Sequence, residues 1–193
     1  MARLKNDIQN INHIFEASRN VVIKVGFNGL KMADVAKESN LATGTLYLYF
    51  KNKEDLINQT YLSTKKNIAE ILLFDKNENL SFEQAFKKMW LAYFHFCKQF
   101  PAKILFVEQF LYSGFLDEKI LEEAENFFEP LNNFLKFGID NHLLKNIDYT
   151  ILKAQLTGAI HEIIKINIKQ KKELTEKEID ICFEMAWQAT KLN

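Results

Sequence analysis

The chain has 193 residues, of which 48% are hydrophobic, and its formal net charge is zero. This length and apolar content suit a globular protein with a sizeable core, and the balanced charge gives no global signal of nucleic-acid binding. Residues 1–60 carry 8 Lys and Arg against 6 Asp and Glu. A surplus that small permits DNA binding but does not argue for it.

The cysteines and the longest apolar run bear on where the protein works. Cys97 and Cys182 form neither a CxxC pair nor a disulfide ladder, which predicts a reducing compartment and inert core thiols. The apolar run MWLAYFHFC is too short to span a bilayer, and the N-terminal MARLKNDIQN lacks the apolar core of a signal peptide. We therefore expect a soluble, cytoplasmic protein with no membrane partner.

Apolar spacings of three and four residues recur almost throughout, so the sequence predicts an all-α fold. Gly26 is expected to end the first helix as a left-handed cap, and Asn52 to cap the fourth. The polar DKNEN at 75–79 then breaks the chain. The first four expected helices cover residues 7–25, 32–39, 43–50 and 53–73.

The second half of the chain carries clear helix boundaries. Ser81 with Gln84 and Thr175 with Glu178 are spaced as capping boxes. Pro130 is expected to kink a helical stretch over 117–143 near residues 126–129. The remaining expected helices start after Ser81, at Pro101 (with a buried segment Ile104–Tyr112), after Asp148 and after Thr175.

Residues 32–50 are predicted to form a helix, a tight turn and a second helix. Asn40 can adopt the left-handed conformation that the turn needs. Leu46 and Phe50, four residues apart, point inward from the second helix. Its outer surface and flank then carry Thr43, Gly44, Thr45, Tyr47, Leu48 and Tyr49. Such a small, hydroxyl-rich helix, followed by Lys51 and Lys53, suits the major groove of DNA.

The segment MADVAKESNLATGTLYLYFKNKEDL, which follows a glycine-ended helix, resembles the DNA-binding domain of the tetracycline-repressor (TetR) family over residues 11–57. The resemblance implies that Tyr47 and Lys53 grip phosphates. It implies that Thr43, Gly44, Thr45 and Tyr49 lie against bases or backbone. It also implies two parts: a helix-turn-helix DNA-binding domain, residues 1–53, and a larger helical ligand-binding and dimerisation domain, residues 54–193.

Three positions depart from the family pattern. Lys31 and Ala42 replace residues that would cap the two short helices, at a cost of about 1 kcal/mol each. Lys31 offers a phosphate contact instead, and Leu48 is suited to a thymine methyl or to packing against the first helix. The alternative to a groove-binding unit is a helical subdomain with a tyrosine-rich packing face.

Aromatic residues crowd the segment 80–140. They form either a plain core or an apolar pocket for a small effector, which the family resemblance implies. The candidate pocket residues are Trp90, Phe94, Phe106, Glu108, Gln109, Phe110 and Tyr112. His95 and His161 are interpreted as core or interface histidines. The sequence contains no metal-ligand cluster, nucleophile motif or phosphate loop, so neither a cofactor nor an enzyme activity is expected.

The last two helices carry more apolar positions than one core face needs. A patch with small residues, Ala154, Thr157, Gly158, His161 and Ile164, is the candidate dimer interface. The family resemblance implies that these helices pair with their copies. The resulting hypothesis is a homodimeric, effector-responsive transcription regulator, a repressor of palindromic operator DNA. A protein-interaction module without DNA binding and an enzyme that uses the aromatic cavity are the alternatives.

Overall fold

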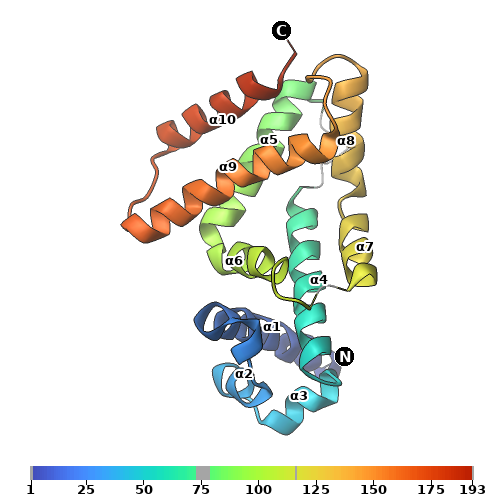
Figure 1. Ribbon diagram of the computed structural model, residues 1–193, viewed down its shortest axis with the longest axis vertical. Helices are drawn as coiled ribbons and strands as arrows, with labels where there is room; N and C mark the ends of the chain where they lie inside the picture. The colour runs from blue at the N-terminus through green and yellow to red at the C-terminus, as the bar shows by residue number, and fades with distance from the viewer. Residues whose placement is uncertain (1, 73–78, 116, 193) are drawn as a thin grey trace. The chain divides into compact units, whose positions relative to one another are not determined.

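The structure is a computed structural model that describes residues 2–72, 79–115 and 117–192. These residues form ten helices and no β-strand, which confirms the predicted all-α fold (Figure 1). Most of the predicted break at 75–79 and the predicted helix end at Leu73 lie outside the described residues. The helices are α1 (Ala2–Gly29), α2 (Met32–Glu38), α3 (Thr43–Tyr49), α4 (Lys53–Ile71), α5 (Phe82–Gln99), α6 (Pro101–Phe110), α7 (Glu118–Asn126), α8 (Glu129–Asp140), α9 (Tyr149–Gln170) and α10 (Glu176–Thr190).

The chain folds as two compact units. The first unit comprises residues 1–67 and 102–126, and the second comprises residues 68–101 and 127–193. The first unit holds α1, α2, α3 and α7, nearly all of α6 and most of α4. The second holds α5, α8, α9 and α10. The helix α4 begins in the first unit and ends in the second without a break.

Gly26 divides α1 into two helical segments, so the first segment ends at this residue, as the sequence predicts. Its φ of 71° and ψ of 172° lie in a region that is essentially restricted to glycine. Helical turns resume after it and run to Gly29. The predicted helix end at Gly26 and its positive φ are therefore confirmed, whereas its ψ is extended and not that of the predicted left-handed cap.

Aromatic rings join three helices of the first unit. Phe27 of α1 lies 5.2 Å from Phe106 and 5.8 Å from Phe110, measured between ring centroids. Phe110 of α6 also stacks on Tyr61 of α4 at 4.0 Å. Burial raises the pKa of Tyr61 to about 12. Since rings of this size dominate the apolar area that a core buries, this cluster fixes α1 and α4 to α6.

The second unit is built around α5, which contacts α9 and α10, while α8 packs on α9. Phe86 lies 5.1 Å from Trp187 and 6.5 Å from Phe183. Trp90 stacks on Phe94 at 5.3 Å. A side chain at Gly138 of α8 would collide with Phe82, so this glycine permits the close approach of α5.

Helix ends follow the sequence closely. The capping boxes of Ser81 with Gln84 and of Thr175 with Glu178 are both formed. Asp148 caps α9 by accepting the N–H of Thr150. These side chains satisfy backbone N–H groups that have no partner inside the helix.

Pro130 separates two helices and does not kink one. The chain leaves the helix after Asn126 and re-enters it at Glu129, with the proline in the first turn of α8. Proline has no N–H, which matters inside a helix but not in its first turn. The break thus falls within the predicted residues 126–129, but it separates two helices, so the prediction of one kinked stretch over 117–143 is wrong. Among the described residues, no helix has the length and apolarity needed to cross a membrane.

Candidate nucleic-acid interface

A tight turn sets the angle between α2 and α3. Asn40 has a φ of 55°, as the sequence predicts, and the N–H of Leu41 donates to the oxygen of Ala36 at 2.9 Å. Val35 of α2 and Leu46 of α3 are fully buried. The inner faces of both helices are thus fixed, which leaves the opposite side of α3 at the surface (Figure 1).

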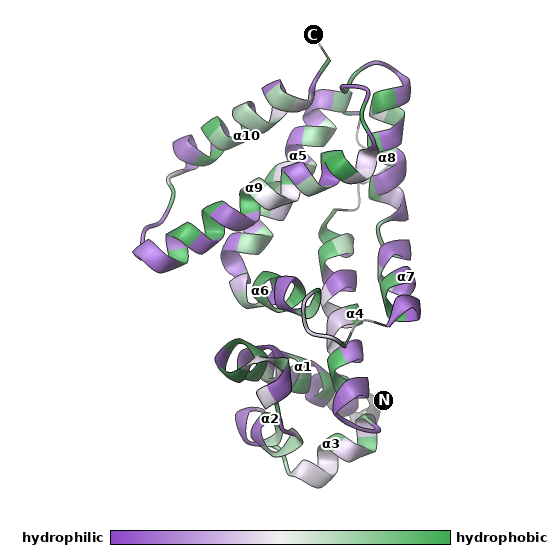
Figure 2. Ribbon diagram, in the orientation of Figure 1, coloured by the Kyte–Doolittle hydropathy of each residue, from purple (hydrophilic) through white to green (hydrophobic). Residues whose placement is uncertain are grey.

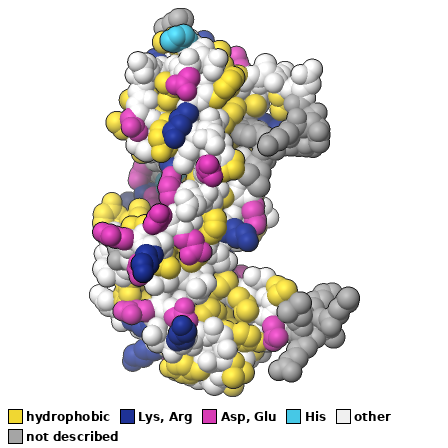
Figure 3. All heavy atoms as spheres, turned by 90° about the vertical axis from the view of Figure 1, so that its right-hand side faces the viewer, with side chains coloured by type: hydrophobic (Ala, Val, Ile, Leu, Met, Phe, Trp, Pro, Cys, Tyr) yellow, Lys and Arg dark blue, Asp and Glu magenta, His cyan; other side chains and the backbone are white. Residues whose placement is uncertain are grey.

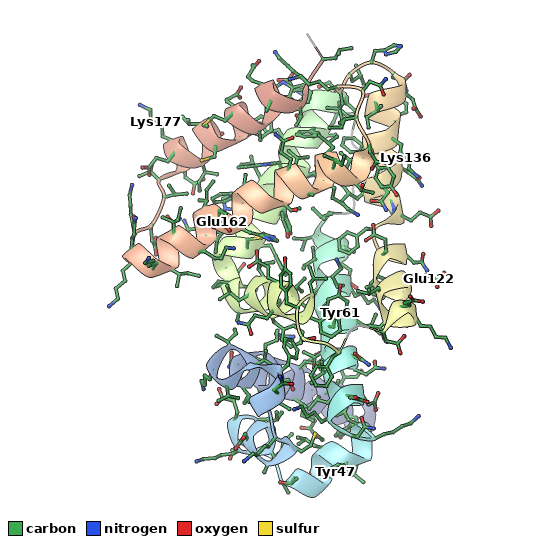
Figure 4. The ribbon with its side chains drawn as sticks, in the orientation of Figure 1. Tyr47, Tyr61, Glu122, Lys136, Glu162 and Lys177 are labelled. Atoms are coloured by element: carbon green, nitrogen blue, oxygen red, sulfur yellow. The ribbon has the colours of Figure 1, made fainter. Side chains whose placement is uncertain are left out.

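The outer side of α3 combines hydroxyl and apolar groups. Leu48 is 80% exposed and Tyr47 is 55% exposed, and Figure 4 labels Tyr47 on this helix. Thr43 and Gly44 are exposed at its start, and Thr45 is half-buried. A Cβ built on Gly44 meets nothing within 4 Å. Packing therefore does not demand glycine here, and the bare backbone is open to a partner.

Tyr49 occupies a different position from Tyr47. It is half-buried, its hydroxyl donates to Asp7 Oδ1 at 2.8 Å, and Asn10 Nδ2 donates to that hydroxyl at 3.4 Å. The hydroxyl of Tyr49 thus ties α3 to α1. Sequence reasoning missed both α1 partners, since nothing in their spacing marks them as neighbours of a residue about forty positions away.

Three lysines flank α3. Lys31 and Lys51 are exposed. The half-buried Lys53 donates from Nζ to the backbone oxygen of Asn28 at 3.1 Å. As the departures from the family pattern predict, neither α2 nor α3 has a side-chain N-cap bond.

The corner between α3 and α4 is already occupied by a carboxylate. Asp55 accepts the N–H of Lys51 at 2.8 Å, and its own N–H donates to Asn52 Oδ1 at 2.9 Å. An anion at the start of α4 would lie close to this negative charge. The backbone N–H groups at the start of α4 are therefore less suited to a phosphate than the side chains of Tyr47 and the three lysines.

Charges of both signs are mixed on one face of the described residues (Figure 3). Figure 3 shows Lys and Arg side chains interspersed with Asp and Glu side chains over the face that it presents. At the C-terminal end of α2, Glu38 forms an ion pair with Lys24 of α1 at 2.9 Å. The hydrogen bond from Lys24 lowers the pKa of that carboxyl. This face therefore carries no single-sign field (Figure 3), and the individual lysines near α3 are the candidate cations for phosphate contacts.

The second unit contains a small apolar cavity of about 40 Å³. Lys153 is the one charged residue on its wall; its ammonium donates to Asn132 Oδ1 at 3.2 Å and lies 5.7 Å from the Phe128 ring. Sequence reasoning missed Lys153 and Asn132. The full lining is Leu72, Met89, Trp90, Tyr93, Leu131, Leu135, Lys153, Leu156, Thr157 and Ile160.

Trp90 is the predicted pocket residue that borders this cavity. It is 3% exposed, and its indole N–H has no hydrogen-bond partner among the described residues. Trp90 also borders a second hollow of about 210 Å³, lined otherwise by α9 and α10. A buried donor without a partner is unusual and invites an acceptor. Phe94, stacked on Trp90, is fully buried and lines neither hollow.

The other predicted pocket residues belong to the first unit. Phe106 and Phe110 are fully buried in its aromatic core. Glu108 is half-buried and Gln109 is exposed, so both lie on the solvent-facing side of α6. Tyr112 is 91% exposed, because α6 ends at Phe110 and the chain turns away. The structure therefore does not support Tyr112 as a pocket residue.

The predicted dimer residues fall in different settings. Ala154 and Gly158 are exposed on α9, whereas Ile164 is buried in the core. Thr157 borders the small cavity, and His161 is hydrogen-bonded to the Tyr93 hydroxyl at 2.7 Å. Green apolar segments recur along α9 and α10 in Figure 2. The large apolar side chains exposed on these two helices are Ile151, Ile166, Ile168, Ile181 and Met185.

The remaining histidine and the two cysteines show no sign of a reactive or metal-binding site among the described residues. His95 is exposed on α5, so it is not a core histidine, and the predicted interface role stays a prediction. Cys97 is fully buried, and burial raises the pKa of the half-buried Cys182. No group of three or more His, Cys, Asp or Glu side chains suited to a metal ion occurs in the described part of the chain.

Known proteins resemble the chain in both halves. Residues 14–60 match the bacterial regulatory proteins of the tetR family, and residues 81–191 match the tetracyclin repressor-like C-terminal domain. An uncharacterised helix-turn-helix transcriptional regulator of Haemophilus influenzae is 32% identical over 110 residues. That match covers 57% of this chain and 58% of the relative, which is less than two thirds of either.

Solved structures share the fold. A TetR-family regulator of Marinobacter aquaeolei superimposes with a TM-score of 0.90 at 21% identity and covers 100% of both chains. The regulator FadR of Bacillus subtilis, solved in complex with stearoyl-CoA, gives a TM-score of 0.64 at 18% identity. That likeness covers 84% of this chain and 89% of FadR. At these identities the likeness concerns the fold alone.

Proposed function

Because this chain belongs to the TetR family of bacterial regulatory proteins, we propose that it is a ligand-responsive transcription regulator that reads DNA through α3. It acts as a repressor and binds palindromic operator DNA as a homodimer. A small apolar or amphipathic effector releases it. Residues 1–53 serve DNA binding, and residues 54–193 serve ligand binding and dimerisation.

The exposed side of α3 carries this proposal. Tyr47 and Leu48 project from a short helix whose opposite side is buried. The tyrosine hydroxyl suits a phosphate, and the leucine suits a thymine methyl. Gly44 leaves the backbone open at the start of the helix. Lys31, Lys51 and Lys53 supply the cations that phosphate contacts require.

A dimer follows from the size of one reading helix. A single α3 covers one half-site, and a palindrome offers two, about 34 Å or a multiple of one DNA turn apart. The exposed isoleucines of α9 and α10 would be covered if these helices packed against their copies. Ala154 and Gly158 would allow their backbones to approach closely.

The cavity of the second unit supports an apolar effector. Its volume of about 40 Å³ is far below the roughly 300–1,000 Å³ of pockets that hold small-molecule ligands. An effector must therefore bind better to a more open state of the unit. This difference in affinity is what shifts the conformational equilibrium toward the open state. The N–H of Trp90 and the ammonium of Lys153 are suited to an acceptor group on an otherwise apolar ligand.

Operator selection tests DNA binding. Fragments of the source genome that bind the full chain are recovered, sequenced and footprinted. We expect one enriched palindrome with two protected half-sites centred about one DNA turn, or a multiple of it, apart. Enrichment that does not exceed that of random fragments would contradict the proposal.

Tryptophan fluorescence tests the effector site. The chain has two tryptophans, so Trp187→Phe leaves Trp90 as the sole reporter. The probe is stearoyl-CoA, the ligand with which FadR of Bacillus subtilis was solved. We expect saturable changes in Trp90 emission and release of the selected DNA. If emission changes without release, or if neither occurs, an acyl-chain effector is wrong.

One observation favours a second candidate function. Leu48 is 80% exposed, and an exposed large apolar side chain also suits a protein partner. In that case the chain is a helical interaction module, and α3 docks onto a protein. Binding that is insensitive to salt and independent of DNA would favour the module.

A further inference from the structure

The side chain of Lys53 is held from two sides within the first unit. Its Nζ donates to the backbone oxygen of Asn28 at 3.1 Å and lies 5.5 Å from the centre of the Phe115 ring. Asn28 comes from the end of α1, and Phe115 follows α6. Asn28 precedes the helix-turn-helix of residues 32–50, and Phe115 lies well beyond it in the sequence.

A defined turn places the Phe115 ring. After α6 ends, the hydroxyl of Ser113 donates to the oxygen of Phe110 at 2.7 Å and accepts the N–H of Phe115 at 3.1 Å. Gly114 between them has a φ of 73°, a conformation that other residues resist. The ring of Phe115 also lies 6.0 Å from that of Phe27. Its position is therefore set by α6 and α1 together.

We propose that Phe115 is a positioning residue for DNA binding, which holds the ammonium of Lys53 ready for a phosphate. The face of an aromatic ring attracts a cation. An ammonium has three N–H donors, and the described residues take one of them, through Asn28. Two donors remain for a phosphate. A lysine that is already held loses less side-chain freedom when it binds.

This inference rests on the proposed DNA-binding function, and it adds a way in which α6 could control DNA affinity. Phe115 belongs to the segment that continues α6, whose Phe110 packs on Phe27 and Tyr61. Any movement of the end of α6 that displaces the Phe115 ring would directly change the position of the Lys53 ammonium, and with it the proposed phosphate contact. DNA affinity would then respond to α6 without any bending of α4.

The test compares Phe115→Leu with Phe115→Tyr in the full chain, on the genome-selected duplex, in wild-type and Lys53→Ala backgrounds. Phe115→Leu removes the aromatic face and should weaken binding by about 2- to 5-fold. Phe115→Tyr keeps the face and should retain wild-type affinity. With Lys53→Ala in place, Phe115→Leu should cause no further loss.

A second measurement needs no DNA and separates the two proposals. The ring current of Phe115 should shift the Lys53 ε-CH₂ protons upfield in the NMR spectrum. This shift should persist in Phe115→Tyr and disappear in Phe115→Leu. If it is absent from the wild-type spectrum, the inference is wrong even where DNA binding is confirmed. If the shift is present but the full chain does not bind DNA, the proposed function fails, and the positioning role fails with it.

The double-variant comparison can also overturn the inference. Equal losses from Phe115→Leu with and without Lys53 would mean that the ring acts through the fold. An unchanged affinity in Phe115→Leu would mean that Lys53 needs no positioning.

Discussion

The hydroxyl groups of the two tyrosines of α3 lie in different surroundings. Tyr47 is exposed, whereas the hydroxyl of Tyr49 is engaged by Asp7 and Asn10. Spacing alone placed both on the DNA-facing side. The distinction depends on side chains of α1 that approach only in the folded chain, so the sequence could not reveal it.

Removing each hydroxyl tests whether the two groups serve different tasks. Tyr47→Phe should weaken DNA binding about 10-fold, because a hydrogen bond to a charged phosphate is lost, and should leave the melting temperature unchanged. Tyr49→Phe should instead lower the free energy of unfolding by about 1 kcal/mol. Binding titrations and thermal melts of both variants check this. The opposite pattern would exchange the two assignments.

Two glycines of the first unit provide a second matched pair. Gly44 lies in a helix with open space around it, so Gly44→Ala should raise stability by up to about 1 kcal/mol while weakening DNA binding. Gly26→Ala should lower stability by about 1–3 kcal/mol, because alanine resists its φ and ψ. Chemical denaturation and DNA titration measure both effects. A Gly44→Ala variant with wild-type DNA affinity would remove Gly44 from the interface.

At the scale of the elements, local signals were the reliable ones. The capping boxes, the Asp148 cap and the left-handed Asn40 each depend on neighbours within a few residues, and each formed as predicted. Predictions failed where the packing of distant segments determines the local structure. At Pro130, for example, the missing N–H is compatible both with a kinked helix and with the first turn of a new helix. The end of α6 was placed two residues too late, which put Tyr112 in a pocket instead of on the surface.

The start of α10 should give a measurable pH response. Hydrogen bonds from the N–H and hydroxyl of Thr175, together with Lys172, lower the pKa of Glu178 from 4.5 to about 2. A carboxyl whose pKa is lower in the folded state adds stability above about pH 4.5. That contribution is lost as the pH falls toward 2.

An NMR titration of Glu178 checks this response. In Thr175→Ala the bond from the hydroxyl is lost but the backbone N–H still donates, so the pKa of Glu178 should rise part of the way toward its ordinary value, whereas Thr175→Ser should keep it low. A titration near pH 4.5 in the wild-type chain would contradict the assignment.

At the scale of the whole molecule, each unit has its own candidate role. The first carries the exposed side of α3, and the second carries the cavity and the exposed apolar side of α9 and α10. The sequence and the family resemblance predicted a DNA-binding part, residues 1–53, and a ligand-binding and dimerisation part, residues 54–193, and this division of tasks stays a prediction. They could not predict Lys153 at the cavity wall, because it meets its neighbours only through the packing of α8 on α9.

The dimer is open to a direct test. Gly158 is exposed on α9 with open space beside it, so Gly158→Arg should be tolerated by the fold but should place a charge in the proposed interface. We expect a monomer in sedimentation experiments and DNA affinity reduced by about 100-fold or more, since avidity is lost. Glu122→Arg on α7 is the control, and it should change neither property. A dimeric Gly158→Arg variant would place the interface elsewhere.

The salt dependence of operator binding by the full chain tests the central claim, that exposed groups around α3 bind DNA through phosphates. With about 6–10 phosphate contacts, the logarithm of the binding constant should fall linearly with the logarithm of salt concentration. Affinity should drop by about 10³ to 10⁵ between roughly 50 and 200 mM salt. The slope should become shallower by about 0.9 in Lys53→Ala. A flat salt dependence, or a slope that Lys53→Ala leaves unchanged, would contradict the account.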